Sequence, residues 1–342
     1  MIISRTPYRL SLFGGGTDFP EWFHQNGGAV LTTTINRYCY VSLRRLPPFF
    51  EHRNRVVYSK VEIVQDIDEI SHPVVRSVLQ HEELRDGVEI HYDGDLPARS
   101  GVGSSSAFTV GLLHCVRQLQ GKETSSWELG QKAVEIERKV LGEPGGVQDQ
   151  YACAVGGVNV FHFRTDGAIR RLTDLRLEAG AHRMSEWLML LYSGVSRVSG
   201  ELHSSTSISS HKGERVLNRL HEMVEEGAEV VRTFTAESAP LLGQLLEESW
   251  ALKLALNPRA ENAELAELAR WMVRNGSLGG KISGAGGGGF ALFCVPPDQQ
   301  PKIRAKLPSR WLHVPFSFES SGTTIIFNDQ TTRALGTRSS WK

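Results

Sequence analysis

Cysteine is scarce in this chain of 342 residues, and its four copies stand far apart. Cys39, Cys115, Cys153 and Cys294 form no C-x-x-C pair, which argues against a structural zinc site or a redox motif. We expect these thiols to be reduced and buried. Free cysteines are typical of cytoplasmic proteins, and we predict that location.

Long apolar runs and an excess of charge are also missing. No apolar stretch reaches the length that spans a bilayer, and the first residues lack the charged and apolar regions of a signal peptide. The 38 acidic side chains balance the 38 basic ones, without a Lys/Arg run of the kind that binds nucleic acid. We therefore expect a soluble protein whose partner is a small molecule, with no nucleic acid and no membrane. A monomer and a homodimer are both compatible with the sequence.

The length predicts two domains, because 342 residues exceed the usual size of a single core. We place the boundary near residue 180, which gives one domain at 1–180 and another at 181–342. Hydrophobic periodicity then predicts the individual elements. Strands are predicted at 8–13, 29–43, 88–92, 158–163, 187–192, 290–295 and 323–327, and helices at 104–120, after Ser125, and at 212–234, 239–256 and 260–274.

Glycine, by contrast, is abundant, and clusters of it mark close backbone approaches. The chain has 34 glycines, and clusters of them lie at 14–16, 101–103, 145–146 and 284–289. Two familiar nucleotide motifs fail near the last cluster. A Walker loop would need Ser or Thr at Ile282 and glycine at Asn275. A G-x-G-x-x-G pattern does occur at 284–289, but it leads into a strand, which argues against a Rossmann dehydrogenase.

A loop rich in glycine and serine joins a predicted strand to a predicted helix at 97–107. Unpaired amides at a helix N-terminus bind anions, and glycines let the backbone come close to a phosphate. Serine hydroxyls add donors to phosphate or a ligand for Mg²⁺. A single serine N-cap is the alternative, but it would not need two spaced glycines. We predict a phosphate-binding loop made of Pro97, Gly101, Val102, Gly103, Ser104, Ser105, Ser106 and Ala107.

Three separated segments, 5–18, 97–107 and 281–289, match one superfamily in the expected order. With them the chain resembles the GHMP kinases, which include galactokinase, homoserine kinase and mevalonate kinase. Residues 5–18 and 193–197 look more closely like the D-glycero-D-manno-heptose 7-phosphate kinases. The resemblance implies a two-domain α+β fold, with an N-terminal ribosomal-protein-like domain, a C-terminal ferredoxin-like domain and the active site between them. It also implies ATP and Mg²⁺.

The same resemblance assigns contacts within these segments. It places Gly101, Gly103, Ser104 and Ser106 on phosphate, and Ser105 on Mg²⁺. The glycine segment that contains Gly284 and Gly286 would support the phosphate loop and the substrate side.

Glu137 points toward the apolar side of its predicted helix, four residues after Ala133 and three before Val140. An unpaired carboxylate would be costly there, so it needs a cationic partner. Two partners are open, a neighbouring Arg or Lys and an Mg²⁺ ion shared with Ser105. The resemblance favours the metal.

Asp149 follows a glycine turn and matches the family's catalytic aspartate. In that role it would accept or orient the proton of the attacking hydroxyl, whereas the alternative is an acid in the first turn of a helix. Arg9 matches an arginine of the first motif and would steady the transferring phosphoryl group. A surface arginine on an alternating strand is the alternative for Arg9.

Asp18 matches a sugar-binding aspartate, and we predict that Thr17 contacts the substrate beside it, although Thr17 and Asp18 would also suit a turn. Galactokinases carry a glutamate and a histidine where this chain has Gly15 and Gly16. We interpret the vacated volume as room for the longer C6 substituent of a heptose phosphate. Arg197 is our candidate for binding its phosphate.

The leading hypothesis is an ATP-dependent kinase acting on the anomeric hydroxyl of a sugar phosphate. The resemblance suggests D-glycero-D-manno-heptose 7-phosphate, converted to the 1,7-bisphosphate for GDP-heptose and surface polysaccharide synthesis. Another GHMP kinase, of the galactose, fucose or mevalonate type, is the second hypothesis. A catalytically silent sensor of nucleotide and sugar is the third, and retention of Asp149, Glu137 and Ser105 counts against it.

Overall fold

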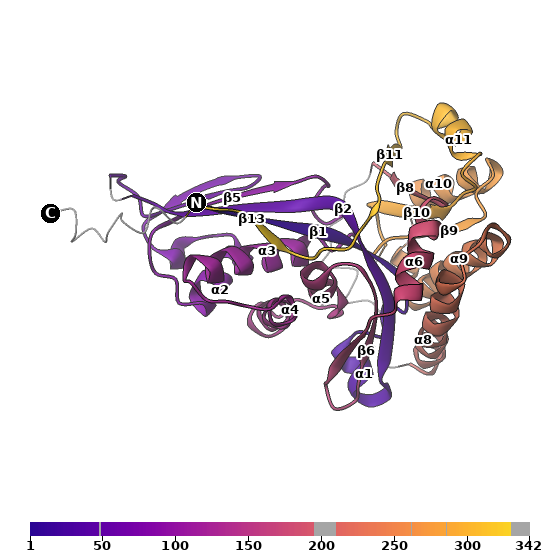
Figure 1. The fold of residues 1–342 in the computed structure, drawn as a ribbon, viewed down its shortest axis with the longest axis horizontal. Coiled ribbons are helices and arrows are strands. Elements are labelled where there is room, and N and C mark those ends of the chain that lie inside the picture. Colours follow the sequence, from indigo (N-terminus) through magenta and orange to yellow (C-terminus); the bar gives the residue numbers. More distant parts are fainter. Residues whose placement is uncertain (48, 195–209, 261, 285, 330–342) are drawn as a thin grey trace.

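The computed structural model describes five stretches of the chain: residues 1–47, 49–194, 210–260, 262–284 and 286–329. Arg197 lies outside these described residues. Two β-sheets with flanking helices make up the described part, which confirms the predicted α+β class (Figure 1). None of the described helices is long and apolar enough to cross a membrane. The four cysteines are free and buried, as expected.

Two long antiparallel strands, β1 (Ile2–Phe13) and β2 (Gly28–Arg45), form the spine of a nine-stranded sheet. The first half of β2 pairs with β6 and its second half with β5, so the sheet divides around this strand. The order is β13-β1-β2-β5-β3-β4, with β12 and β6 attached to β2, and β7 attached to β6. The other strands are β3 (Asn54–Val57), β4 (Val61–Val64), β5 (Val88–Gly94), β6 (Val158–Phe163), β7 (Ile169–Leu172), β12 (Phe318–Glu319) and β13 (Thr324–Asn328).

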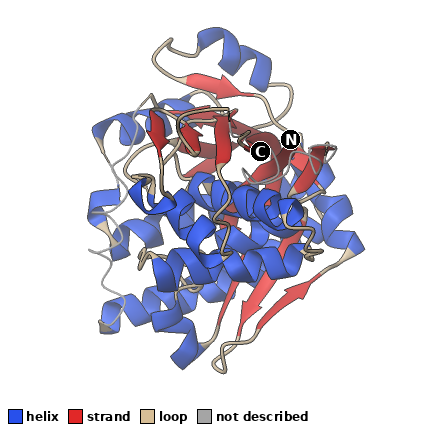
Figure 2. Ribbon diagram, turned by 90° about the vertical axis from the view of Figure 1, so that its left-hand side faces the viewer, coloured by secondary structure: helices blue, strands red, loops and turns tan. Residues whose placement is uncertain are grey.

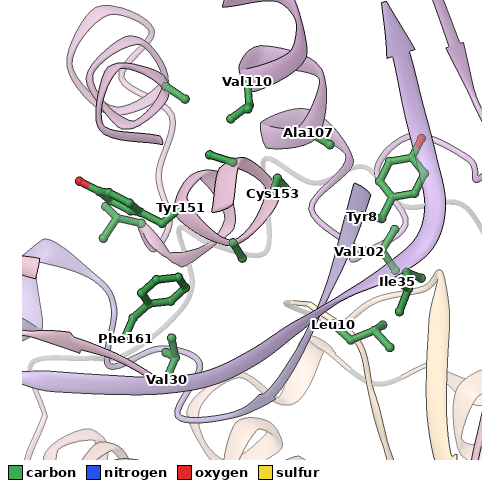
Figure 3. Close-up of a cluster of buried hydrophobic side chains, with 14 of the residues drawn as sticks. Tyr8, Leu10, Val30, Ile35, Val102, Ala107, Val110, Tyr151, Cys153 and Phe161 are labelled. Atoms are coloured by element: carbon green, nitrogen blue, oxygen red, sulfur yellow. The ribbon is translucent and has the colours of Figure 1, made fainter. Parts of the chain in front are cut away.

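Helices α3 (Ser104–Leu119) and α5 (Gln148–Val155) lie against β1 and β2. Figure 1 shows them with α2 and α4 on one side of the large sheet, and Figure 2 shows a broad layer of helices in front of the strands. Figure 3 shows part of the buried core, where labelled side chains of the large sheet such as Tyr8, Val30 and Phe161 lie with those of α3 and α5, such as Ala107 and Cys153. The remaining helices of this half are α1 (Pro20–Asn26), 3₁₀ Ile67–Glu69, α2 (Pro73–His81), α4 (Ser126–Val134), the π-helical turn Glu135–Val140 and α6 (Leu175–Ser185).

A second, four-stranded antiparallel sheet has the order β11-β8-β10-β9. Its side chains alternate between two cores, because successive strand residues face opposite sides. Leu190 and Leu292 join the core of the large sheet, whereas Leu191 belongs to a separate core that includes Leu265. The strands are β8 (Leu188–Tyr192), β9 (Gly279–Ile282), β10 (Phe290–Cys294) and β11 (Leu312–Val314), and the helices are α8 (His211–Arg232), 3₁₀ Ala236–Ser238, α9 (Ala239–Leu256), 3₁₀ Pro258–Ala260, α10 (Ala263–Arg274) and α11 (Gln300–Lys306).

The end of the described chain returns to the first sheet, where β13 pairs with β1 and β12 pairs with β2. This pairing explains why β1 begins at Ile2, earlier than periodicity predicts, since Ile2 lies opposite Asn328. The domain boundary near residue 180 stays a prediction. Strands that precede it and strands that follow it, β12 and β13, lie in the same large sheet. The predicted helix at 260–274 begins later, at Ala263, because the Asn262 side chain accepts from the amide of Leu265 and caps it there.

Candidate active site

The predicted phosphate loop lies between β5 and the first turn of α3. Gly101 and Gly103 have left-handed backbones, with φ of 85° and 73°. A side chain on Gly101 would bring its Cβ within 2.5 Å of the Ser283 carbonyl oxygen, so only glycine fits there. Gly103 occupies the N-cap position of α3, and no side chain caps the helix. The serine N-cap alternative is therefore wrong, and the first amides of α3 suit an anion.

Serine hydroxyls of the loop divide into two groups. Those of Ser100 and Ser104 hold the loop itself: Ser100 Oγ donates to the Pro97 carbonyl at 2.6 Å, and Ser104 Oγ accepts from the Arg99 amide at 3.0 Å. Ser105 is exposed on the first turn of α3. Of the predicted hydroxyl ligands on this turn, Ser105 is therefore the most accessible from outside.

The third glycine segment closes over the phosphate loop. A Cβ on Gly284 would lie 2.6 Å from the Cα of Gly101, and Ser283 Oγ donates to the Gly101 carbonyl at 3.0 Å. Gly286 lies elsewhere, against the backbone of Ala260, where a Cβ would come within 2.6 Å of the carbonyl oxygen. The structure thus brings Gly284, but not Gly286, into contact with the loop.

Arg9 and Asp149 form a two-pronged ion pair beside the loop. Arg9 Nε and Nη2 each donate to one carboxylate oxygen of Asp149 at 2.6 Å, and Nη1 donates to the Gly101 carbonyl at 2.6 Å. The Arg9 side chain is 6% exposed, so it is not a surface arginine, while the Asp149 side chain remains 25% exposed. One guanidinium therefore fixes a partly accessible carboxylate next to the anion site.

Asp18 is buried beside this pair. Its Oδ1 accepts from the Gly16 amide at 2.9 Å, and its Oδ2 accepts from the Gln148 amide at 3.2 Å. A Cβ on Gly146 would lie 1.8 Å from Oδ2, so this glycine makes room for the carboxylate. Burial raises the pKa of Asp18, and the nearby Asp149 charge adds to the increase. The turn 145–149 thus joins both aspartates in one site.

Thr17 was a predicted substrate residue, and the structure assigns it to the turn instead. Its hydroxyl donates to the carbonyls of Gly14 and Ala29 and accepts from the Ala29 amide. The side chain is fully buried, because these bonds fold the turn against β2. Gly15 is buried in the same turn and Gly16 is half-buried.

Glu137 is buried in a π-helical turn, a distortion that is frequent at functional sites. Its carboxylate accepts from Ser106 Oγ at 2.9 Å, from Thr109 Oγ1 at 2.5 Å and from Gln150 Nε2. Burial raises its pKa to about 7. No Lys or Arg of the described residues forms an ion pair with Glu137, so the salt-bridge alternative is not observed there.

Sequence reasoning missed two lysines. The sequence assigned no role to Lys281, because the Walker pattern around it is incomplete. In the structure its Nζ is buried and donates to the carbonyls of Ser11 and Leu12 at 3.0 and 2.7 Å. Burial holds its pKa well below the usual value for lysine. Lys253, on α9, donates to the Gly284 carbonyl at 3.2 Å. No local pattern marks Lys253, because its helix is separated from every motif in the sequence.

Models of the GHMP kinases match both halves of the described chain. The model described as "GHMP kinases N terminal domain" matches residues 70–157, and that described as "GHMP kinases C terminal" matches residues 230–313. The first match contains the phosphate loop, Glu137 and Asp149, and the second contains Gly284 and Lys281. The chain belongs to the GHMP kinases, and it is a small-molecule kinase that uses ATP.

Similar proteins fall in the same family. A D-glycero-alpha-D-manno-heptose 7-phosphate kinase of Campylobacter jejuni is 27% identical over 94% of this chain and 97% of its own length. An L-fucokinase/L-fucose-1-P guanylyltransferase of Bacteroides fragilis is 25% identical over 90% of this chain, which spans 36% of that enzyme. A solved D-glycero-D-manno-heptose 1-phosphate kinase from Bacteroides thetaiotaomicron has the same fold, with a TM-score of 0.76, 23% identity, and coverage of 96% of this chain and 100% of that one.

Proposed function

We propose that this kinase phosphorylates the anomeric hydroxyl of a sugar phosphate, and that D-glycero-D-manno-heptose 7-phosphate is its substrate. One observation carries the proposal of phosphoryl transfer: the Arg9–Asp149 ion pair lies against Gly101 of the phosphate loop. The choice of sugar is supported by the 27% identity to the Campylobacter jejuni enzyme over nearly the full length of both chains.

The chemistry follows from this pair. The acceptor oxygen forms a bond to the γ-phosphorus, the bond from that phosphorus to the β,γ-bridging oxygen breaks, and ADP leaves. The hydroxyl proton passes to Asp149. Hydrogen bonds from Nε and Nη2 of Arg9 keep the Asp149 carboxylate in its orientation. Positive charge on Arg9 and the amides at the start of α3 stabilise the transferring group, since such transfer depends mostly on positioning and electrostatics.

A divalent cation fits the donor side. Glu137 is a buried carboxylate whose hydrogen-bond partners are neutral, and burial raises its pKa to about 7. A hard cation favours oxygen ligands and would stabilise the ionised carboxylate. Glu137 and Ser105 would hold Mg²⁺, which would supply positive charge to the ATP phosphates. Among the described residues no group of three His, Cys, Asp or Glu side chains could hold a metal alone, so phosphate oxygens would complete the site.

The acceptor side combines a buried acid with two residues that lack side chains. Asp18 is held by two backbone amides, and its carboxylate would accept a hydrogen bond from a sugar hydroxyl. Gly15 and Gly16 lie beside it, where the side chains of Ser11, Gln148 and Lys253 approach Gly15. Release of ADP over a panel of sugars and sugar phosphates, with Mg²⁺ and ATP, tests the proposal.

We expect the heptose 7-phosphate to give the highest kcat/KM of the panel. Equal or higher values for galactose or fucose would replace it with the free-sugar alternative. Binding of nucleotide and sugar without any ADP release would indicate a silent sensor.

A further inference from the structure

Three polar groups from separate elements meet above Gly15. A Cβ built on this glycine would lie 3.1 Å from Ser11 Oγ of β1, 3.3 Å from Lys253 Nζ of α9 and 3.5 Å from Gln148 Nε2 of α5. Among the described residues, Ser11 Oγ and Gln148 Oε1 are buried without a hydrogen-bond partner. Buried polar atoms are nearly always hydrogen-bonded, so this point suits a polar ligand.

Three basic side chains, Lys253, Lys281 and Arg9, lie close to one another near this point. Burial is the main cause that lowers the pKa of Lys281, and the charges of Lys253 and Arg9 lower it further. Arg9 is bonded to Asp149, and Lys281 is bonded to two carbonyls. An anion beside Lys253 would relieve the repulsion among these cations.

Two anions of the proposed reaction compete for Lys253, the transferring phosphoryl group and the phosphate that the acceptor already carries. The transferring group already has Arg9 and the amide-rich start of α3 on the donor side. Lys253 Nζ lies instead beside Gly15, in the turn whose Gly16 amide donates to Asp18 on the acceptor side. A phosphomonoester carries about 1.5 to 2 negative charges near pH 7, so it needs a cation of this kind.

We infer that Lys253 binds the phosphate of the acceptor, and that it makes the enzyme select phosphorylated over unphosphorylated sugars. The inference rests on the proposed function, since it names the residue that reads the acceptor's phosphate. Ser11 Oγ would donate to the same group, and Gln148 Oε1 would accept from an adjacent sugar hydroxyl.

Lys253→Met tests the inference, because methionine keeps most of the apolar stem and removes the charge. The measured quantity is the preference, defined as kcat/KM for the heptose 7-phosphate divided by kcat/KM for the same heptose without phosphate. We expect the preference to fall about 100-fold, the usual cost of removing one partner of a buried charge pair. Lys253→Arg should restore part of it, and Lys302→Met, an exposed lysine of α11, should leave it unchanged.

An unchanged preference, with kcat/KM falling equally for both sugars, would assign Lys253 to the transferring group and overturn the inference. A second measurement keeps the two proposals separate. With the donor site filled by a non-hydrolysable ATP analogue, inorganic phosphate should bind wild type at least about tenfold more tightly than Lys253→Met in calorimetry. Equal binding overturns the role of Lys253, whereas a wild-type enzyme that binds phosphate but does not phosphorylate any sugar phosphate overturns the proposed function alone. Unfolding midpoints of the variants confirm that each is folded.

Discussion

The candidate site has a donor end, where ATP would bind, and an acceptor end, where the sugar would bind. Backbone groups form the first, and side chains form the second. At the donor end, the backbones of Gly101 and Gly284 touch, and no side chain fits between them. At the acceptor end, the side chains of Ser11, Gln148 and Lys253 converge on Gly15, and two of their polar atoms have no partner among the described residues. We therefore expect the nucleotide's phosphates to be held by backbone groups, and the acceptor to be recognised by side chains that substitution can change one at a time.

Asp149→Asn acts where the two ends meet, and we expect the largest effect from it. The amide cannot accept the hydroxyl proton, so kcat should fall about 10² to 10⁴-fold. Binding of ATP should change little, because in the described part of the chain Asp149 is linked to the phosphate loop through Arg9. Steady-state kinetics and nucleotide titration measure both quantities. Asp166→Asn, in the exposed turn between β6 and β7, is the matched control. Turnover at the wild-type rate would remove Asp149 from the chemistry.

Glu137→Gln tests the donor end through Mg²⁺ and pH. The cation needs the ionised carboxylate, so in wild type the Mg²⁺ concentration for half-maximal rate should rise about tenfold per pH unit below about 7, the pKa of Glu137. In the Gln variant this concentration should be roughly 10 to 100-fold higher and lose its dependence on pH. An identical Mg²⁺ requirement in both proteins would exclude Glu137 as a ligand.

The same carboxyl predicts a stability effect in the metal-free protein. Its folded pKa, about 7, lies above the ordinary value of 4.5, so its contribution to the free energy of unfolding is complete below pH 4.5 and is lost as pH rises through 7. The loss is about 3 kcal/mol for a shift of this size. Denaturant titrations of the wild type and of Glu137→Gln should differ in their pH dependence over that window.

Gly101→Ala tests whether the donor end depends on backbone contact. The Cβ would meet the Ser283 carbonyl at 2.5 Å on a backbone with φ of 85°, so the loop must move. We expect KM for ATP to rise about tenfold and the free energy of unfolding to fall by about 2 kcal/mol. Gly142→Ala is the matched control, because Gly142 also has a left-handed φ but has open space around its Cβ. It should lose about 1 kcal/mol of stability and leave KM for ATP unchanged.

The donor end could be predicted from sequence because its pattern is local. Glycine and serine at 97–107 identify a loop before a helix, and the order of α3, Glu137 and Asp149 follows along one stretch of chain. The strands and helices with clear periodicity were also predicted, including β6 at Val158–Phe163 and α9 at Ala239–Leu256. Short elements with exposed or interrupted patterns, such as β3 and β4, were not.

The acceptor end could be predicted only in part, since its members come from distant segments. Asp18 and Gly15 belong to a recognisable motif, but Lys253 reaches them through the packing of α9 against β9 and β1. Thr17 was assigned to the substrate because it stands in the same motif, and the sequence does not show that its hydroxyl is used by the turn. Chemistry that depends on which elements pack together is visible only after folding.

We expect the smallest effect on activity from Gly15→Ala, which changes the acceptor end and leaves the donor end intact. Its φ is compatible with alanine, and the added Cβ would lie 3.1 to 3.5 Å from Ser11 Oγ, Lys253 Nζ and Gln148 Nε2. Flexible side-chain ends can shift by a few tenths of an ångström, so stability should be nearly unchanged, whereas the methyl group displaces the polar groups proposed to bind the acceptor.

We expect KM for the sugar phosphate to rise several-fold, because a misplaced methyl group weakens binding by about 1 kcal/mol. KM for ATP should stay at its wild-type value. This pattern is the opposite of that expected for Gly101→Ala, because one glycine borders the acceptor and the other borders the nucleotide. If Gly15→Ala instead raised KM for ATP and left KM for the acceptor unchanged, the polar groups around Gly15 would bind the nucleotide. The division between a backbone-built donor end and a side-chain-built acceptor end would then be wrong.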